Sequence, residues 1–147
     1  MCGPINPSSF DKNKFFFLFI DNYSRKIWIY FLKQKSKVFV AFKNFKAIVE
    51  KENGYEIKFL RSDRGGEFTS KEFNDFCESH RIRRPLMVPR SPQQNGVAER
   101  KNKTIFNMAR CMLKAKNMPK EFWVESISCA VYLSNRFPTR SVKDKTP

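Results

Sequence analysis

Two six-residue apolar runs near the start of the chain constrain its fold most. Phe15–Ile20 and Ile27–Leu32 flank the polar sequence DNYSRK. Each run is far shorter than the roughly 20 apolar residues that a membrane-spanning helix needs. Both runs are rich in aromatic and β-branched residues, and the residues between them favour a turn. They therefore predict an antiparallel hairpin.

Beyond the hairpin, helical and strand periodicities alternate. We first expect a helix that is capped by Ser36 and ends at Gly54, followed by a strand at 57–60. A short helix then begins with a capping box formed by Thr69 and Glu72, and a strand follows at 82–88. The remaining elements are a long helix at 96–116 and a last helix at 119–135. The aromatic stripes of the first two of these helices are interpreted as core packing. This order predicts an α/β fold with a mixed sheet.

Composition limits the partners of the chain. Its 147 residues suit one domain. Lys and Arg number 29 against 14 Asp and Glu, which gives a net charge of +15. Such an excess indicates a polyanionic partner, nucleic acid first and an anionic membrane surface second. No apolar run is long enough for a span, and the four separated cysteines favour reduced thiols in an intracellular compartment. We therefore expect no membrane partner.

Asp63 is the first candidate metal ligand. It directly follows the predicted strand at 57–60 and lies in a loop with Gly65 and Gly66. A carboxylate at the carboxyl end of a strand, beside flexible backbone, can hold a divalent metal against phosphate. The same residue type also makes Asx turns, so the pattern alone leaves both interpretations open.

Glu99 is the second candidate. It lies in the first turn of the long predicted helix and is the only acid between Arg81 and Lys116, a window with ten Lys and Arg. A lone carboxylate amid cations suits a metal ion that meets a phosphodiester. A favourable acid at a helix N-terminus is the alternative.

Several longer sequence segments resemble one family. SDRGGEF (62–68) and SPQQNGVAERKNKTI (91–105) resemble the catalytic core of integrases from retroviruses and, more closely, from copia-type LTR retrotransposons. CGPINP, FIDNYSRKIWIYFL and MPKEFWVESISCAVYLSNRFP are similar to copia-type Pol polyprotein. The resemblance covers nearly the whole chain in the expected order.

The resemblance implies a ribonuclease H-like α/β fold, with a five-stranded mixed sheet flanked by helices on both faces. It implies a core over residues 1–140, clipped at its N-terminus, and the start of a linker at 141–147. In the family, two aspartates and a glutamate hold two Mg²⁺ or Mn²⁺ ions for 3′-end processing and strand transfer of element DNA into target DNA. Asp63 corresponds to the second aspartate and Glu99 to the glutamate. The first aspartate would either fall just before Met1 or have been lost, so we expect this stretch to bind metal weakly and to be inactive.

DNA contacts are expected around Glu99. Lys103 lies one helical turn after Glu99 on the same face, so both can meet one DNA end. Further candidates lie in the preceding loop: Arg90, Gln93, Gln94 and Asn95. Relatives usually carry an aromatic residue at the position of Arg90. Two more candidates, Arg100 and Lys101, lie on the same helix as Glu99. For each single cation, a solvated surface charge is an equal alternative.

The resemblance also implies that the protein binds DNA and assembles with further copies of itself. It implies that the protein acts in the nucleus, after a stage in a cytoplasmic particle. One rival interpretation is a non-catalytic DNA-binding or assembly remnant of the same fold. Another is a ribonuclease H or Holliday-junction resolvase, which shares the sheet but not the sequence NGVAE that leads into the long helix.

Overall fold

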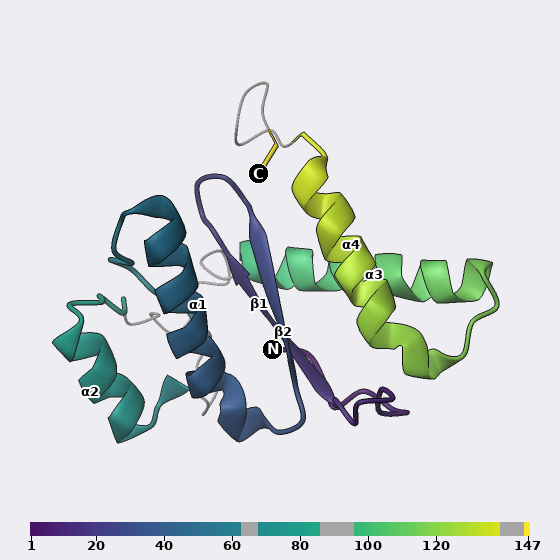
Figure 1. The fold of residues 1–147 in the computed structure, drawn as a ribbon, viewed down its shortest axis with the longest axis horizontal. Helices are drawn as coiled ribbons and strands as arrows, with labels where there is room; N and C mark the ends of the chain where they lie inside the picture. Colours follow the sequence, from purple (N-terminus) through teal and green to yellow (C-terminus); the bar gives the residue numbers. More distant parts are fainter. Residues whose placement is uncertain (63–67, 86–95, 139–145) are drawn as a thin grey trace. The chain divides into compact units, whose positions relative to one another are not determined.

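The computed structural model of the chain describes residues 1–62, 68–85, 96–138 and 146–147 (Figure 1). They divide into two compact units. The hairpin unit comprises Met1–Gln34 and Ala98–Pro147, and the helical unit comprises Lys35–Val97. No helix in the described ranges is long and apolar enough to cross a membrane.

The predicted hairpin is confirmed at its predicted bounds. Strands β1 (Phe15–Ile20) and β2 (Ile27–Leu32) pair antiparallel, with Leu18 opposite Ile29. The turn is held by Asp21, whose Oδ2 accepts the backbone N–H of Ser24 over 2.7 Å. On the other side of β1, Cys2 forms a single antiparallel bridge with Phe16.

Two helices cover one face of this hairpin. Helix α3 (Gly96–Ala115) and helix α4 (Trp123–Arg136) follow each other along the chain, and a 3₁₀ turn, η4 (Lys120–Phe122), precedes α4 (Figure 1). Alternate strand residues pack against both helices, because successive side chains of a strand point to opposite faces. The buried cluster comprises Phe16, Leu18, Ile27, Ile105, Ala109, Trp123, Ile127, Ala130 and Val131.

A side-chain amide fixes α4 to the hairpin. Asn135 Nδ2 donates to the carbonyl oxygen of Ile27 over 2.8 Å, and its Oδ1 accepts the Ile27 N–H over 2.9 Å. Both polar groups at the start of β2 are thereby satisfied by one residue 108 positions away.

The helical unit has an aromatic core. After a 3₁₀ turn, η1 (Lys35–Lys37), helix α1 (Val38–Asn53) ends at Gly54, which has a φ of 69° and donates its N–H to the Glu50 carbonyl. Helix α2 (Lys71–Ser79) packs Phe73 against Phe42, with ring centroids 5.4 Å apart. Phe42 and Phe73 are fully buried, which confirms that these stripes form core.

Two predicted caps are wrong. Lys37 precedes α1 without a side-chain cap, and Ser36 lies inside η1, because the chain first makes a 3₁₀ turn there. Ser70, not Thr69, caps α2: its Oγ accepts the Phe73 N–H over 3.2 Å. The last helix begins at Trp123 rather than at Pro119, after η4.

The five-stranded sheet stays a prediction. Within the described ranges the sheet has two strands. The predicted strands at 57–60 and 82–88 are represented by one parallel bridge between Phe59 and Arg83, and residues 86–88 lie outside the described residues.

Candidate active site

Glu99 lies where the sequence predicts it, in the first turn of α3. Its side chain is exposed, and it makes no ion pair or hydrogen bond with the part of the chain that the structure describes. The positive end of the helix dipole stabilises a carboxylate at this position. Glu99 therefore offers its oxygens to solvent and to ligands.

Cations surround this carboxylate along α3. Lys103 is exposed and follows Glu99 by four residues, which brings it to nearly the same helix face at a rise of about 6 Å. Arg100 is also exposed, and Lys101 is half-buried. Glu99 is the only acid in the sequence of α3, against five Lys and Arg. The helix therefore presents one carboxylate within a basic surface, an arrangement that suits a polyanion.

Asn102 is a polar residue of this region that sequence analysis missed. Its Oδ1 is buried and has no hydrogen-bond partner among the residues that the structure describes. A buried acceptor without a partner destabilises the fold by about 1–3 kcal/mol, so packing alone gives no reason for an amide at this position. The only sequence signal is its spacing, three residues after Glu99.

The other predicted site residues lie outside the described residues: Asp63, Arg90, Gln93, Gln94 and Asn95. The segments that lead to them are described. Leu60 donates its N–H to the Arg83 carbonyl over 3.0 Å, and the bridge between Phe59 and Arg83 is parallel. The chain therefore runs in the same direction at residues 58–60 and at Arg83.

The donor type at Glu99 fits a hard cation. Mg²⁺ and Mn²⁺ prefer carboxylate oxygens, and Glu99 supplies such a group in an exposed position. No group of three His, Cys, Asp or Glu side chains that could hold a metal occurs among the described residues.

Comparison with known proteins decides the family. The family model of the integrase core domain matches residues 4–92. The chain belongs to the integrase core domain family. The resemblance to retrotransposon Pol polyprotein seen in the sequence is thereby confirmed.

Similar polyproteins come from plant transposons. The integrase core is 51% identical over 139 residues to the retrovirus-related Pol polyprotein from transposon TNT 1-94 of Nicotiana tabacum. It is 37% identical to that from transposon RE2 and 34% identical to that from RE1, both of Arabidopsis thaliana. These matches cover 95% of the chain but only 9–10% of each polyprotein. The chain therefore spans about a tenth of the curated relatives that it matches.

Solved structures share the fold. An integrase chain of the simian T-cell lymphotropic virus intasome in complex with PP2A regulatory subunit B56 gamma superposes with a TM-score of 0.68, at 20% identity, over 89% of this chain and 45% of that chain. The HTLV-2 integrase catalytic core in complex with magnesium, in its trimeric form, superposes with a TM-score of 0.60, at 22% identity, over 88% and 78%. The integrase core fold, which is ribonuclease H-like, is thus shown.

Proposed function

We propose that the integrase core of which these residues form part transfers phosphoryl groups on DNA, by 3′-end processing and by strand transfer of element DNA into target DNA. The exposed carboxylate of Glu99 at the start of α3, alone among cations, carries the proposal. Membership of the integrase core domain family supports it. The magnesium complex of the HTLV-2 core supports a metal-dependent reaction.

Asp63 and Glu99 are the proposed metal ligands. Two Mg²⁺ or Mn²⁺ ions, when bound, supply Lewis-acid chemistry at the scissile phosphodiester. The parallel bridge between Phe59 and Arg83 favours a site at the carboxyl edge of a five-stranded sheet, where Asp63 would follow its strand. Glu99 would contribute its carboxylate from the N-terminus of α3.

The residues of this chain that bind DNA are proposed on the same helix. Lys103 places its ammonium group on the face of Glu99 and would hold a backbone phosphate beside the reacting one. Arg100 and Lys101 would add further phosphate contacts. The sequence also assigns DNA contacts to a loop outside the described residues, which holds Arg90, Gln93, Gln94 and Asn95.

We propose that the 147 residues on their own bind metal weakly and transfer no strands. They hold two of the three carboxylates that the family resemblance implies. We further propose that residues 1–140 form the core and 141–147 begin a linker, that copies of the chain assemble on DNA, and that the protein works in the nucleus. The trimeric and dimeric forms of the HTLV-2 core support self-assembly.

A strand-transfer assay with Mn²⁺ tests the catalytic proposal. The chain extended by one aspartate before Met1 should join labelled duplex ends to target DNA, and the unextended chain should not. In the extended chain, Glu99→Gln should lower the rate at least about 100-fold, because a carboxylate ligand is lost at the site of developing charge.

Glu125→Gln is the matched control, since Glu125 is also an exposed acid in the first turn of a helix. It should leave the rate unchanged. An extended chain that binds duplex DNA but transfers no strands would instead identify a non-catalytic DNA-binding module. If the extended chain cleaves RNA–DNA hybrids instead of transferring strands, it would be identified as a ribonuclease H.

Duplex binding tests the role of Lys103 separately. Lys103→Ala should weaken binding and lower the slope of log K against log salt by about one, the value for one lost phosphate contact. Lys114→Ala, an exposed lysine in the last turn of α3, is the control and should have the smaller effect. Equal slopes for Lys103→Ala and the unmodified chain would refute the assignment.

A further inference from the structure

The helical unit carries an exposed surface that the proposed function does not use. The segments around Phe59 and Arg83 are joined by a parallel bridge, in which the Arg83 N–H donates to the Lys58 carbonyl over 2.8 Å and the Leu60 N–H donates to the Arg83 carbonyl over 3.0 Å. The bridge places the side chains of Phe59 and Arg83 side by side on one face, because bridge partners point the same way.

Side chains of the bridged segments that point outward alternate with side chains that point into the core of the unit. Ile82 is buried, and Arg84 points inward, with its guanidinium carbon 4.9 Å from the Phe73 ring centroid. Arg84 also donates to the Phe68 carbonyl and to Asn74 Oδ1, so its guanidinium group is hydrogen-bonded within the helical unit. Residues one position away point outward instead. Phe59 is 59% exposed, and Arg61 and Arg83 are exposed.

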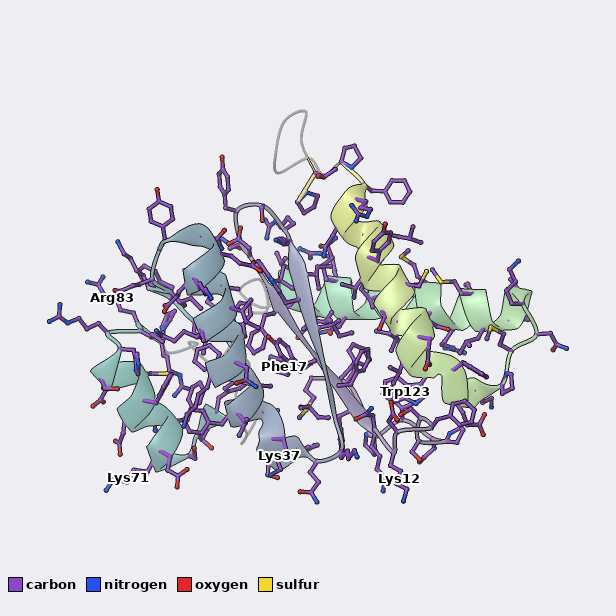
Figure 2. The ribbon with its side chains drawn as sticks, viewed as in Figure 1. Lys12, Phe17, Lys37, Lys71, Arg83 and Trp123 are labelled. Atoms are coloured by element: carbon purple, nitrogen blue, oxygen red, sulfur yellow. The ribbon has the colours of Figure 1, made fainter. Side chains whose placement is uncertain are left out.

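A cation lies beside the exposed aromatic ring. The guanidinium carbon of Arg83 is 5.7 Å from the centroid of Phe59. Figure 2 labels Arg83 on the outside of the helical unit. Arg81, in the turn after α2, is exposed as well. We call Phe59 and Arg83, together with the exposed Arg61 and Arg81 two residues along each segment, the Phe59 face.

The charge of this surface points to a polyanion. The two segments 55–61 and 78–84 hold five Lys and Arg against two acids, Glu56 and Glu78. Glu78 belongs to helix α2, and Glu56 lies three residues before Phe59. An exposed aromatic ring flanked by arginines is the pattern of a single-strand binding surface, where a base stacks on the ring and cations hold the backbone.

We propose that the Phe59 face binds a single strand of DNA, with a base stacked on Phe59 and phosphates held by Arg61, Arg81 and Arg83. Intact duplex DNA keeps its base faces stacked inside the helix and offers only base edges in the grooves, so it cannot use the exposed ring. The surface lies in the helical unit, whereas Glu99 and Lys103 belong to the hairpin unit. This inference therefore does not depend on the proposed integrase chemistry.

The test is binding of a fluorescent oligo-dT of about 12 nucleotides, a length within the range that stacking surfaces cover. Phe59→Leu should weaken binding about tenfold, because it removes the ring but keeps an apolar side chain. Phe59→Trp should bind as tightly as the unmodified chain and lose tryptophan fluorescence when the oligomer is added, because a stacked base quenches the indole. Arg83→Ala should lower the single-strand salt slope by about 0.7.

Phe137→Leu is the matched control, since Phe137 is 62% exposed but lies beyond α4 in the hairpin unit. It should not change binding. The proposal is overturned if Phe59→Leu binds oligo-dT as the unmodified chain does, if the fluorescence of Phe59→Trp does not change, or if a duplex or an oligo-rU depends on Phe59 more strongly. Lys103→Ala should weaken duplex binding without altering the effect of Phe59→Leu on the single strand, so the two proposals fail separately.

Discussion

At the scale of single residues, Glu50 shows how one carboxylate joins two segments. Its side chain accepts a hydrogen bond from Lys46 Nζ over 2.6 Å and one from the Ile57 N–H over 2.7 Å. Burial by itself would raise the pKa of Glu50, but these two hydrogen bonds outweigh it, with smaller help from the charges of Lys46 and His80. The pKa of Glu50 is therefore below its ordinary value, and the end of α1 is tied to the segment that leads to Phe59.

The lowered pKa predicts how stability depends on pH. A carboxylate with a depressed folded-state pKa stabilises the fold above its unfolded-state pKa, here about 4.5, and this contribution is lost as the pH falls through the folded-state pKa. Glu50→Gln should lower the free energy of unfolding by about 1 kcal/mol at pH 7, because charge-assisted hydrogen bonds become neutral ones. The difference should shrink below pH 4.5.

Urea denaturation at a series of pH values measures both quantities. Glu52→Gln is the control, because Glu52 is an exposed acid of the same helix. It should change stability by less than about 0.5 kcal/mol at any pH. A stability difference between Glu50→Gln and the unmodified chain that persists unchanged at pH 3 would contradict the charge-based explanation.

At the scale of elements, local sequence patterns predicted the hairpin with its bounds and the four helices, but they missed the starts of α1, α2 and α4. The hairpin bounds agree, since β-branched and aromatic runs with a turn between them act locally. Helix starts differ because two neighbouring residues can both cap and the sequence does not distinguish them. Thr69 precedes Ser70, and the extended backbone of Ser70, with ψ 146°, lets its hydroxyl accept the Phe73 N–H.

The cap of α2 can be tested directly. Ser70→Ala should lower the free energy of unfolding by about 1 kcal/mol, because the Phe73 N–H loses its acceptor at the start of the helix. Thr69→Ala should lower the free energy of unfolding by a smaller amount. Thermal or urea unfolding of the two variants gives the order, and a larger loss for Thr69→Ala would restore the capping box that the sequence suggests.

At the scale of the whole molecule, contacts between residues that are far apart along the chain could not be predicted from the sequence. The sequence correctly predicted that Glu99 lies in the first turn of α3, and the structure adds that its side chain is exposed. No local pattern predicts that Asn135 holds the start of β2 or that Phe59 lies beside Arg83, because these pairs are far apart along the chain. The convergence of Asp63 and Glu99 is of the same kind and stays a prediction.

Net charge gives a prediction for the molecule as a whole. With a charge of +15, the chain should bind duplex DNA mainly through phosphates and release counterions from the DNA. If 6–10 phosphates are contacted, affinity should fall about 10³- to 10⁵-fold between roughly 50 and 200 mM salt, for any duplex sequence. Anisotropy titrations at a series of KCl concentrations measure the slope. A slope near zero, or one that changes strongly with base sequence, would mean that base contacts rather than the basic surface of α3 hold the DNA.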